Sequence, residues 1–201
     1  MTLTLQTILD HSLCASDWDS LNKAIGGDLK TEISIGDVLL NNGLAEAMWC
    51  LQCVEPRKRV EAIMPAVKRA AVHTTDQRVH DCIAAIDQWL TGDDTVDLNA
   101  ASQAAAQAEH AASEQAADAA FSSWIAKDAE YEGTAWAAWA SWVSADAARS
   151  ARAAAELIVD AAATWATRAA AALGVDAAER KRQEADLLAM FPPIILKGEL
   201  A

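Results

Sequence analysis

Two alanine-rich runs decide the fold: LNAASQAAAQAEHAASEQAADAAFSSWIAKDAE, residues 98–130, and TAWAAWASWVSADAARSARAAAELIVDAAATWATRAAAAL, residues 134–173. Alanine has the highest intrinsic helix propensity, and neither run contains a proline, so we expect two long helices. Between them, Gly133 can end the first helix in a left-handed conformation and Thr134 can cap the second. Because so short a connection suits only antiparallel neighbours, the sequence predicts a helical hairpin.

Polar residues in both runs recur every three to four positions, which is the spacing of stripes along a helix. Between the stripes lie alanines and tryptophans, and the tryptophans must supply much of the buried apolar area. We expect Trp136, Trp139 and Trp142 to pack against the N-terminal part of the chain, with a partner-binding aromatic patch as the alternative. The polar stripes are Gln103, Gln107, His110, Glu114 and Asp118 on the first helix, and Arg149, Arg152, Glu156, Asp160 and Thr164 on the second.

The remaining segments predict smaller helices. Residues 1–92 form an N-terminal helical block with helices at 3–13, from Asp37 to Cys53 with a division at 41–43, at 57–75 with its basic residues outside, and from an Asp76 cap to Gly92. Residues 29–35 suit either a short strand or a connector. A charged helix at 176–190 ends at Phe191, after which Ile194, Ile195 and Leu196 dock on the body or form a contact with another subunit.

The predicted fold is therefore all-α: an N-terminal helical block packed on a long antiparallel alanine-rich hairpin, with a C-terminal helix. The chain divides into residues 1–92 and residues 98–201, an acidic linker joining them. Tryptophans spread through the first block, at positions 18, 49 and 89, indicate that the two parts share one core.

Charge is the second clear property of the chain. It carries 29 acidic and 16 basic residues, a formal net charge of −13, which opposes binding to a nucleic-acid backbone and favours a protein partner with a basic surface. Solubility of an alanine-rich chain is the simpler explanation of the same charge. No apolar run reaches the length that a bilayer requires, and residues 1–5 lack a secretory pattern, so a cytoplasmic location is expected.

Four cysteines are expected to be reduced in that compartment. Cys50 and Cys53 have the spacing of half a zinc site and are the weak metal candidates, with His73, His80 and Cys82 nearby in sequence. Because the pair lies in a helical pattern and no second paired motif follows, buried structural cysteine is the favoured interpretation. No metal or other cofactor is predicted.

The sequence contains no recognisable catalytic pattern. It lacks a glycine-rich phosphate loop, a nucleophile elbow and a two-histidine metal motif. His73 and His80 would share a helical face only if Asp76 did not interrupt the helix. Asp76, Arg78 and Asp81 form a dense charged cluster, which a helix cap with local ion pairs explains. We therefore predict that the protein is not an enzyme.

Several of these signals occur in an order that resembles the Imm5-like group of immunity proteins of phages and bacteria. The matching residues are GLAEAMW at 43–49, Pro56-Arg57, DQRV at 76–79 with Ile83, Trp89 and Gly92, the tryptophan-spotted alanine helices, and Glu179-Arg180 with Gln183. The resemblance runs from residue 37 onward and transfers no catalytic residue. It implies a helical, non-enzymatic protein of phage or bacterial conflict systems.

Three functions compete at this point. The first is an interaction protein that blocks a basic surface on a nucleic-acid-handling enzyme or toxin, as an immunity or anti-defence factor. The second is a self-assembling protein, such as a homodimer whose hairpins pair. The third is a metal-dependent enzyme that uses Cys50 and Cys53. For the first function, the candidate contact residues are Asp93, Asp94 and Asp97, or the face with Glu109, Glu114 and Asp118.

Overall fold

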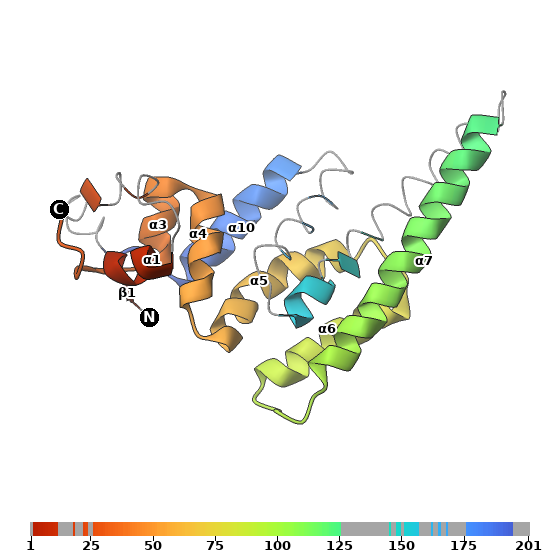
Figure 1. Ribbon diagram of the computed structural model, residues 1–201, viewed down its shortest axis with the longest axis horizontal. Coiled ribbons are helices and arrows are strands. Elements are labelled where there is room, and N and C mark those ends of the chain that lie inside the picture. The colour runs from red at the N-terminus through yellow and green to blue at the C-terminus, as the bar shows by residue number, and fades with distance from the viewer. Residues whose placement is uncertain are drawn as a thin grey trace. The chain divides into compact units, whose positions relative to one another are not determined.

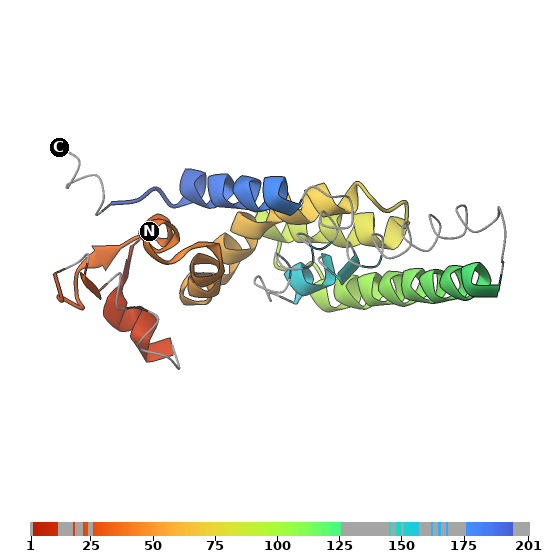
Figure 2. The same cartoon turned by 90° about the horizontal axis from the view of Figure 1, so that it is seen from above.

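A computed structural model describes residues 2–11, 18, 22–23, 26–125, 145, 148–149, 151–156, 162, 165, 168 and 176–194, with the side chains of 116–125 and 176 left aside. The chain is mostly helical, and the all-α prediction is confirmed. The protein has two compact units (Figures 1 and 2), Met1–Ala62 with Arg180–Ala201, and Ile63–Glu179. The boundary thus lies at residues 62–63, inside a helix, and not in the predicted linker after residue 92.

Unit 1 begins with a two-stranded antiparallel ladder. Strand β1, Leu3–Thr4, pairs with β2, Glu32–Ile33, so that Leu3 lies opposite Ile33. Helix α1, Leu5–His11, follows directly, and the predicted helix start at residue 3 is therefore wrong by two residues. Propensity could not reveal this, because a two-residue strand is defined only by its distant partner.

Helix α3, Ile35–Asn42, begins with a reciprocal cap. The Asp37 backbone N–H donates to Ser34 Oγ at 3.0 Å, and the Ser34 N–H donates to Asp37 Oδ2 at 2.8 Å. The predicted start at Asp37 is therefore two residues late. Gly43, with φ +102°, divides α3 from α4, Leu44–Cys50, and confirms the predicted division. A single 3-10 turn, η2, Leu51–Cys53, follows.

The segment after the last helix is docked on α3. The Ile194 N–H donates to both carboxylate oxygens of Asp37, at 3.1 and 3.2 Å, and that carboxylate is fully buried. A Cβ atom built on Gly36 would overlap the carbonyl oxygen of Phe191 and lie 2.9 Å from the nitrogen of Pro193. The prediction that this segment docks on the body is correct for Ile194, and the residues beyond it lie outside the described part.

We predict that Gly36→Ala destabilises the protein by about 1–3 kcal/mol, because the added methyl group must push residues 191–193 away from α3. A loss of stability would be informative, because replacing glycine by alanine inside a helix normally stabilises a protein by up to about 1 kcal/mol. Urea unfolding gives the free energy, and hydrogen exchange at the Ile194 amide gives the location. Leu40→Ala, an exposed change on the same helix, serves as the control. A stability gain in Gly36→Ala would contradict the docking.

The core of unit 1 joins its helices through aliphatic side chains and one aromatic pair. The rings of Trp18 and Trp49 lie 5.9 Å apart and are tilted at 45°, a favourable aromatic geometry. Trp18 is buried in this core. The fully buried aliphatic residues of this unit include Leu5, Ile8, Ile33, Ile35, Val38, Leu51, Val60 and Leu187.

Three consecutive helices make up most of the described part of unit 2. Helix α5, Pro56–Ala71, starts in unit 1 and contains Pro65. Proline has no backbone N–H, so the helix lacks one backbone hydrogen bond at this position. Helix α6, Gln77–Leu90, starts at the predicted Asp76 cap, and Gly92 follows it with φ +103°. Helix α7, Leu98–Ile125, packs along α6 (Figure 2). The buried faces of this unit include Val67, Val79, Ile83, Ile86, Ala105, Ala108 and Ala112.

The second alanine-rich run is described only in part, and its described alanines are buried. The thiol of Cys82 on α6 donates to the Ala151 carbonyl at 3.6 Å, and Ser102 Oγ on α7 donates to Glu156 at 2.6 Å. These described residues of the run therefore contact α6 and α7. The predicted connection at 131–133 and the predicted packing of Trp136, Trp139 and Trp142 lie outside the described residues.

The last helix, α10, Asp176–Met190, has its predicted bounds and ends before Phe191. Its first turn is not simply solvated, however. Glu179 is buried and accepts from Arg69 Nε at 2.9 Å and from Arg69 Nη2 at 2.8 Å. The prediction that Arg69 lies outside is therefore wrong, because a carboxylate 110 positions away in sequence pairs with it.

Candidate partner-binding surface

Unit 2 distributes its charges unevenly. Residues 76–118 contain nine acidic residues and one basic residue, Arg78. Among the described lysine and arginine side chains of the unit, Lys68, Arg69, Arg78, Arg149 and Arg152 form ion pairs, and Arg168 lies over a tryptophan ring. Helices α6 and α7 with the loop between them, which form the α6–α7 hairpin, thus keep an excess of negative charge. All the predicted contact residues lie on this hairpin.

The α6–α7 loop holds its carboxylates in place by neutral donors. Asp93 accepts from the Thr95 N–H at 2.9 Å, from Thr95 Oγ1 at 2.6 Å and from Gln88 Nε2 at 2.7 Å, and these bonds lower its pKa. Asp97 accepts from the Ala100 N–H at 2.9 Å and caps α7. Asp94 lies between them and is exposed. Hydrogen bonds to neutral groups leave the negative charges of Asp93 and Asp97 in place.

Glu109, by contrast, is part of the helix interface. Its Oε1 lies 2.8 Å from Arg149 Nε, and its Oε2 lies 2.7 Å from Arg152 Nη1. The Glu109 and Arg149 side chains are only 17% and 16% exposed, and Arg149 also donates to Ser113 at 3.3 Å. The exposure on which Glu109 was chosen as a contact residue is therefore not observed. The stripe from Arg149 to Glu156 faces α7 for the same reason.

We predict that Glu109→Gln lowers the free energy of unfolding by about 2 kcal/mol, because it leaves two largely shielded arginines without their shared anion. Glu114→Gln, on the same helix with a 67% exposed side chain paired to His110, should change it by less than about 0.5 kcal/mol. Urea denaturation of both variants measures the difference. Equal effects would show that Glu109 is not part of the interface.

The two remaining predicted residues of this face are Glu114 and Asp118. Glu114 is exposed, and so are Gln103, Gln107 and His110, which confirms the polar stripe over that stretch of α7. The side chain of Asp118 lies outside the described part. The loop carboxylates and Glu114 are thus the described contact candidates that face solvent.

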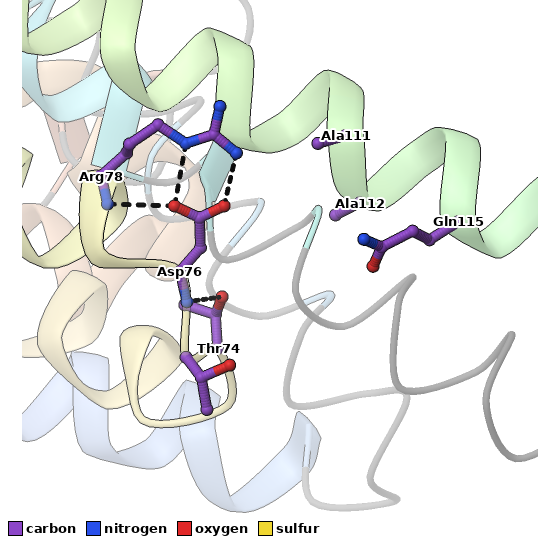
Figure 3. A pocket seen from close by; sticks show the side chains of 7 residues that line it. Thr74, Asp76, Arg78, Ala111, Ala112 and Gln115 are labelled. Atoms are coloured by element: carbon purple, nitrogen blue, oxygen red, sulfur yellow. Dashed lines mark hydrogen bonds and ion pairs between the residues drawn. The ribbon is translucent and has the colours of Figure 1, made fainter.

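A second feature of the hairpin lies at the N-terminus of α6. Asp76 accepts from the Arg78 N–H at 3.0 Å, from Arg78 Nε at 3.0 Å and from Arg78 Nη2 at 2.6 Å (Figure 3). The bond from the Arg78 guanidinium is the main reason why the pKa of Asp76 is lowered. His80 donates to the Thr74 carbonyl at 3.0 Å, and Asp81 accepts from Gln77 at 2.8 Å. The sequence interpretation of this charged cluster is confirmed for Asp76, which caps α6 and pairs with Arg78, whereas Asp81 is bonded to the neutral Gln77 and not to a cation.

A cavity of about 180 Å³ opens beside this cap (Figure 3). It lies between the α5–α6 connection and α7 and is lined by Thr74, Thr75, Asp76, Arg78, Ala111, Ala112 and Gln115. Sequence reasoning missed it, because nothing in the sequence indicates that Gln115 lies opposite Asp76. Only the packing of α6 on α7 brings these residues together.

We predict that Asp76→Ala lowers the free energy of unfolding by about 1 kcal/mol near neutral pH, whereas Asp76→Asn, which keeps the cap, loses much less. Because the pKa of Asp76 is lower in the folded state, its carboxylate stabilises the fold fully above the usual aspartate range. That contribution disappears as the pH falls through the lower folded value. Urea unfolding of wild type and Asp76→Ala, repeated toward about pH 3, should show the gap closing. A gap that widens on acidification would contradict the assignment.

The cysteines give little support for metal binding. Cys50 is buried, and burial raises the pKa of its thiol strongly. Burial also raises the pKa of the Cys53 thiol, and it raises the pKa of the Cys82 thiol to about 12. Among the described residues no three His, Cys, Asp or Glu side chains are grouped as a metal site would require. Burial of Cys50 and Cys82 agrees with the structural interpretation.

An aromatic contact of the second run was also not anticipated. The guanidinium carbons of Arg149 and Arg168 lie 4.9 and 4.4 Å from the ring centre of Trp165, within the range of cation–π attraction. Trp165 was expected to serve mainly as buried apolar area. Its ring instead orients Arg149, the same residue that pairs with Glu109.

Within the described residues, no helix combines the length and the apolar character that crossing a bilayer would demand. Comparison of the chain with protein-family models, with curated proteins and with solved structures finds no match.

Proposed function

We propose that this protein is a non-enzymatic, acidic interaction protein that binds and inhibits a nucleic-acid-handling protein through that partner's basic surface. The observation that supports this most is the segregation of charge in unit 2. Arg69, Arg149 and Arg152 are consumed by ion pairs, while Asp93 and Asp97 are bonded to neutral groups. The α6–α7 hairpin is therefore a concentrated negative surface.

Solubility alone would be served by charges of both signs spread over the surface. A field of one sign acts over about 8–10 Å at physiological ionic strength and speeds the approach of an oppositely charged partner. Carboxylates that are already held by hydrogen bonds also lose little side-chain freedom when a partner binds. The loop between α6 and α7 combines both properties, and this favours a role in association.

The biological setting follows from the resemblance to immunity proteins of phages and bacteria, and it belongs to the same proposal. An immunity or anti-defence factor acts by occupying the surface with which a toxin or defence enzyme contacts nucleic acid. Such a surface is basic, so an acidic protein can compete with the phosphate backbone for it. Self-assembly and a metal-dependent activity at Cys50 and Cys53 remain the alternative predictions.

We predict that Asp93→Asn, Asp94→Asn and Asp97→Asn combined slow association with the partner by about three- to tenfold at low salt, since three steering charges are lost while asparagine still caps α7. The control removes three exposed carboxylates of unit 1 instead: Asp10→Asn, Glu32→Gln and Glu61→Gln. Both triples have the same net charge. Partners captured from host lysate are identified by mass spectrometry, and association rates and inhibition are then measured with the purified partner.

Support requires a basic nucleic-acid-handling protein whose activity falls at stoichiometric amounts of the acidic protein, with the loop triple weaker than the control triple. Equal losses in both triples would show that only net charge matters and would reject the loop as the surface. A captured partner whose activity is unaffected would reject inhibition. A homo-oligomer with no partner above background would favour the self-assembly alternative.

A further inference from the structure

The cavity beside the α6 cap has the size of a subsite for one side chain. Its volume of about 180 Å³ is below the roughly 300–1,000 Å³ of typical cofactor and small-molecule sites. It lies on the acidic hairpin defined above, yet its residues are not those of the α6–α7 loop. It therefore needs an account of its own.

The lining offers two unused acceptors and an apolar wall. An ionised carboxylate has about four acceptor positions, and Arg78 occupies three of those of Asp76 through its backbone N–H, Nε and Nη2. Across the cavity, the side chain of Gln115 reaches back from α7 toward Asp76 and adds a carbonyl oxygen (Figure 3). The methyl groups of Ala111 and Ala112 line the wall between them.

The sign of the surrounding charge decides which group suits this lining. Asp76 and Arg78 cancel each other at the rim, so the remaining field comes from the other carboxylates of residues 76–118. A carboxylate or phosphate ligand could pair with Arg78, but that field opposes its approach. A cation is attracted, and a long basic side chain can lay its aliphatic stem on alanine while its head reaches an acceptor.

We propose that this cavity receives one basic side chain, an arginine, of the protein partner. Its guanidinium donates to the remaining acceptor position of Asp76 and to Gln115 Oε1, and its stem lies on Ala111 and Ala112. Arginine suits the cavity better than lysine, because its planar fork can donate to two separated acceptors at once. This inference rests on the proposed function and specifies the contact that would anchor the partner.

The first test titrates nitrogen-labelled protein with N-acetyl-arginine amide and follows the Gln115 side-chain amide by nuclear magnetic resonance. The neutral isostere N-acetyl-citrulline amide is the control ligand. We expect saturable shifts at Gln115 with an affinity on the order of millimolar for the arginine derivative and no saturation for the citrulline derivative. Equal binding of the two ligands would overturn the proposal, because the charge would then have no role.

Variants locate the binding. Gln115→Ala should weaken binding of the arginine derivative by about three- to tenfold, and Asp76→Asn by about tenfold, because each removes an acceptor. Both are followed through the backbone amides of Ala111 and Ala112. Gln107→Ala, a matched change of an exposed glutamine on the same helix, should leave the affinity unchanged. Equal effects of Gln107→Ala and Gln115→Ala would place binding elsewhere and reject the cavity.

A third comparison separates a partner's arginine from a free guanidinium compound. A short peptide with one arginine flanked by lysines should bind more tightly than N-acetyl-arginine amide at low salt, since its neighbours meet the acidic hairpin. If the isolated derivative binds as tightly as the peptide, the occupant is a small molecule and the partner assignment is wrong. If the cavity variants bind probe and partner like wild type while the loop triple still weakens inhibition, only the cavity proposal fails.

Discussion

The ion-pair network around Glu109 is the interaction on which unit 2 depends. Helix α7 and the described part of the second alanine-rich run bury mainly alanine, and alanine methyl groups are so alike that many registers of one helix on another bury similar area. Glu109, Arg149 and Arg152 remove that ambiguity, because their charges are satisfied in one register only. Trp165 adds a directional contact to Arg149 from the second run. A few polar side chains thus specify what the apolar residues leave open, as is known for single buried polar residues in coiled coils.

The same network explains the character of the outer surface. Each of the arginines that pair between helices has its charge balanced by a carboxylate, and Arg69 with Glu179 repeats the arrangement between α5 and α10. Asp93 and Asp97 of the α6–α7 loop are held by hydroxyl, amide and backbone donors instead, so they stay charged and ordered. Arginines are used to pair helices with one another, whereas several of the described acidic residues of the α6–α7 hairpin have no such cation beside them. The negative surface of the hairpin therefore follows from the way in which the helices pack.

Local signals predicted the parts of this fold that local physics decides. The Asp76 cap, the stop at Gly92, the division at Gly43 and the bounds of the last helix are all written in neighbouring residues. Most of the errors concern residues whose partners are far away in sequence: Leu3 pairs with Ile33, Arg69 with Glu179 and Glu109 with Arg149. The start of α3 is the exception, because its cap is local and was still placed two residues late. A polar residue on a predicted helix was assigned to solvent, and only a tertiary contact could show otherwise. The cavity at Asp76 was missed for the same reason.

The loop and the cavity also differ in what each can contribute to binding. Long-range charge mainly changes how fast two proteins meet, whereas a desolvated, hydrogen-bonded contact mainly changes how slowly they part. Asp97 is exposed and Asp93 is partly exposed, so both can act at a distance, but such a carboxylate contributes little once it is in contact. Asp76 is partly shielded, and the alanine wall beside it excludes water from one side of a bound side chain. A surface that inhibits an enzyme needs both, because fast capture without slow release leaves the target free for much of the time.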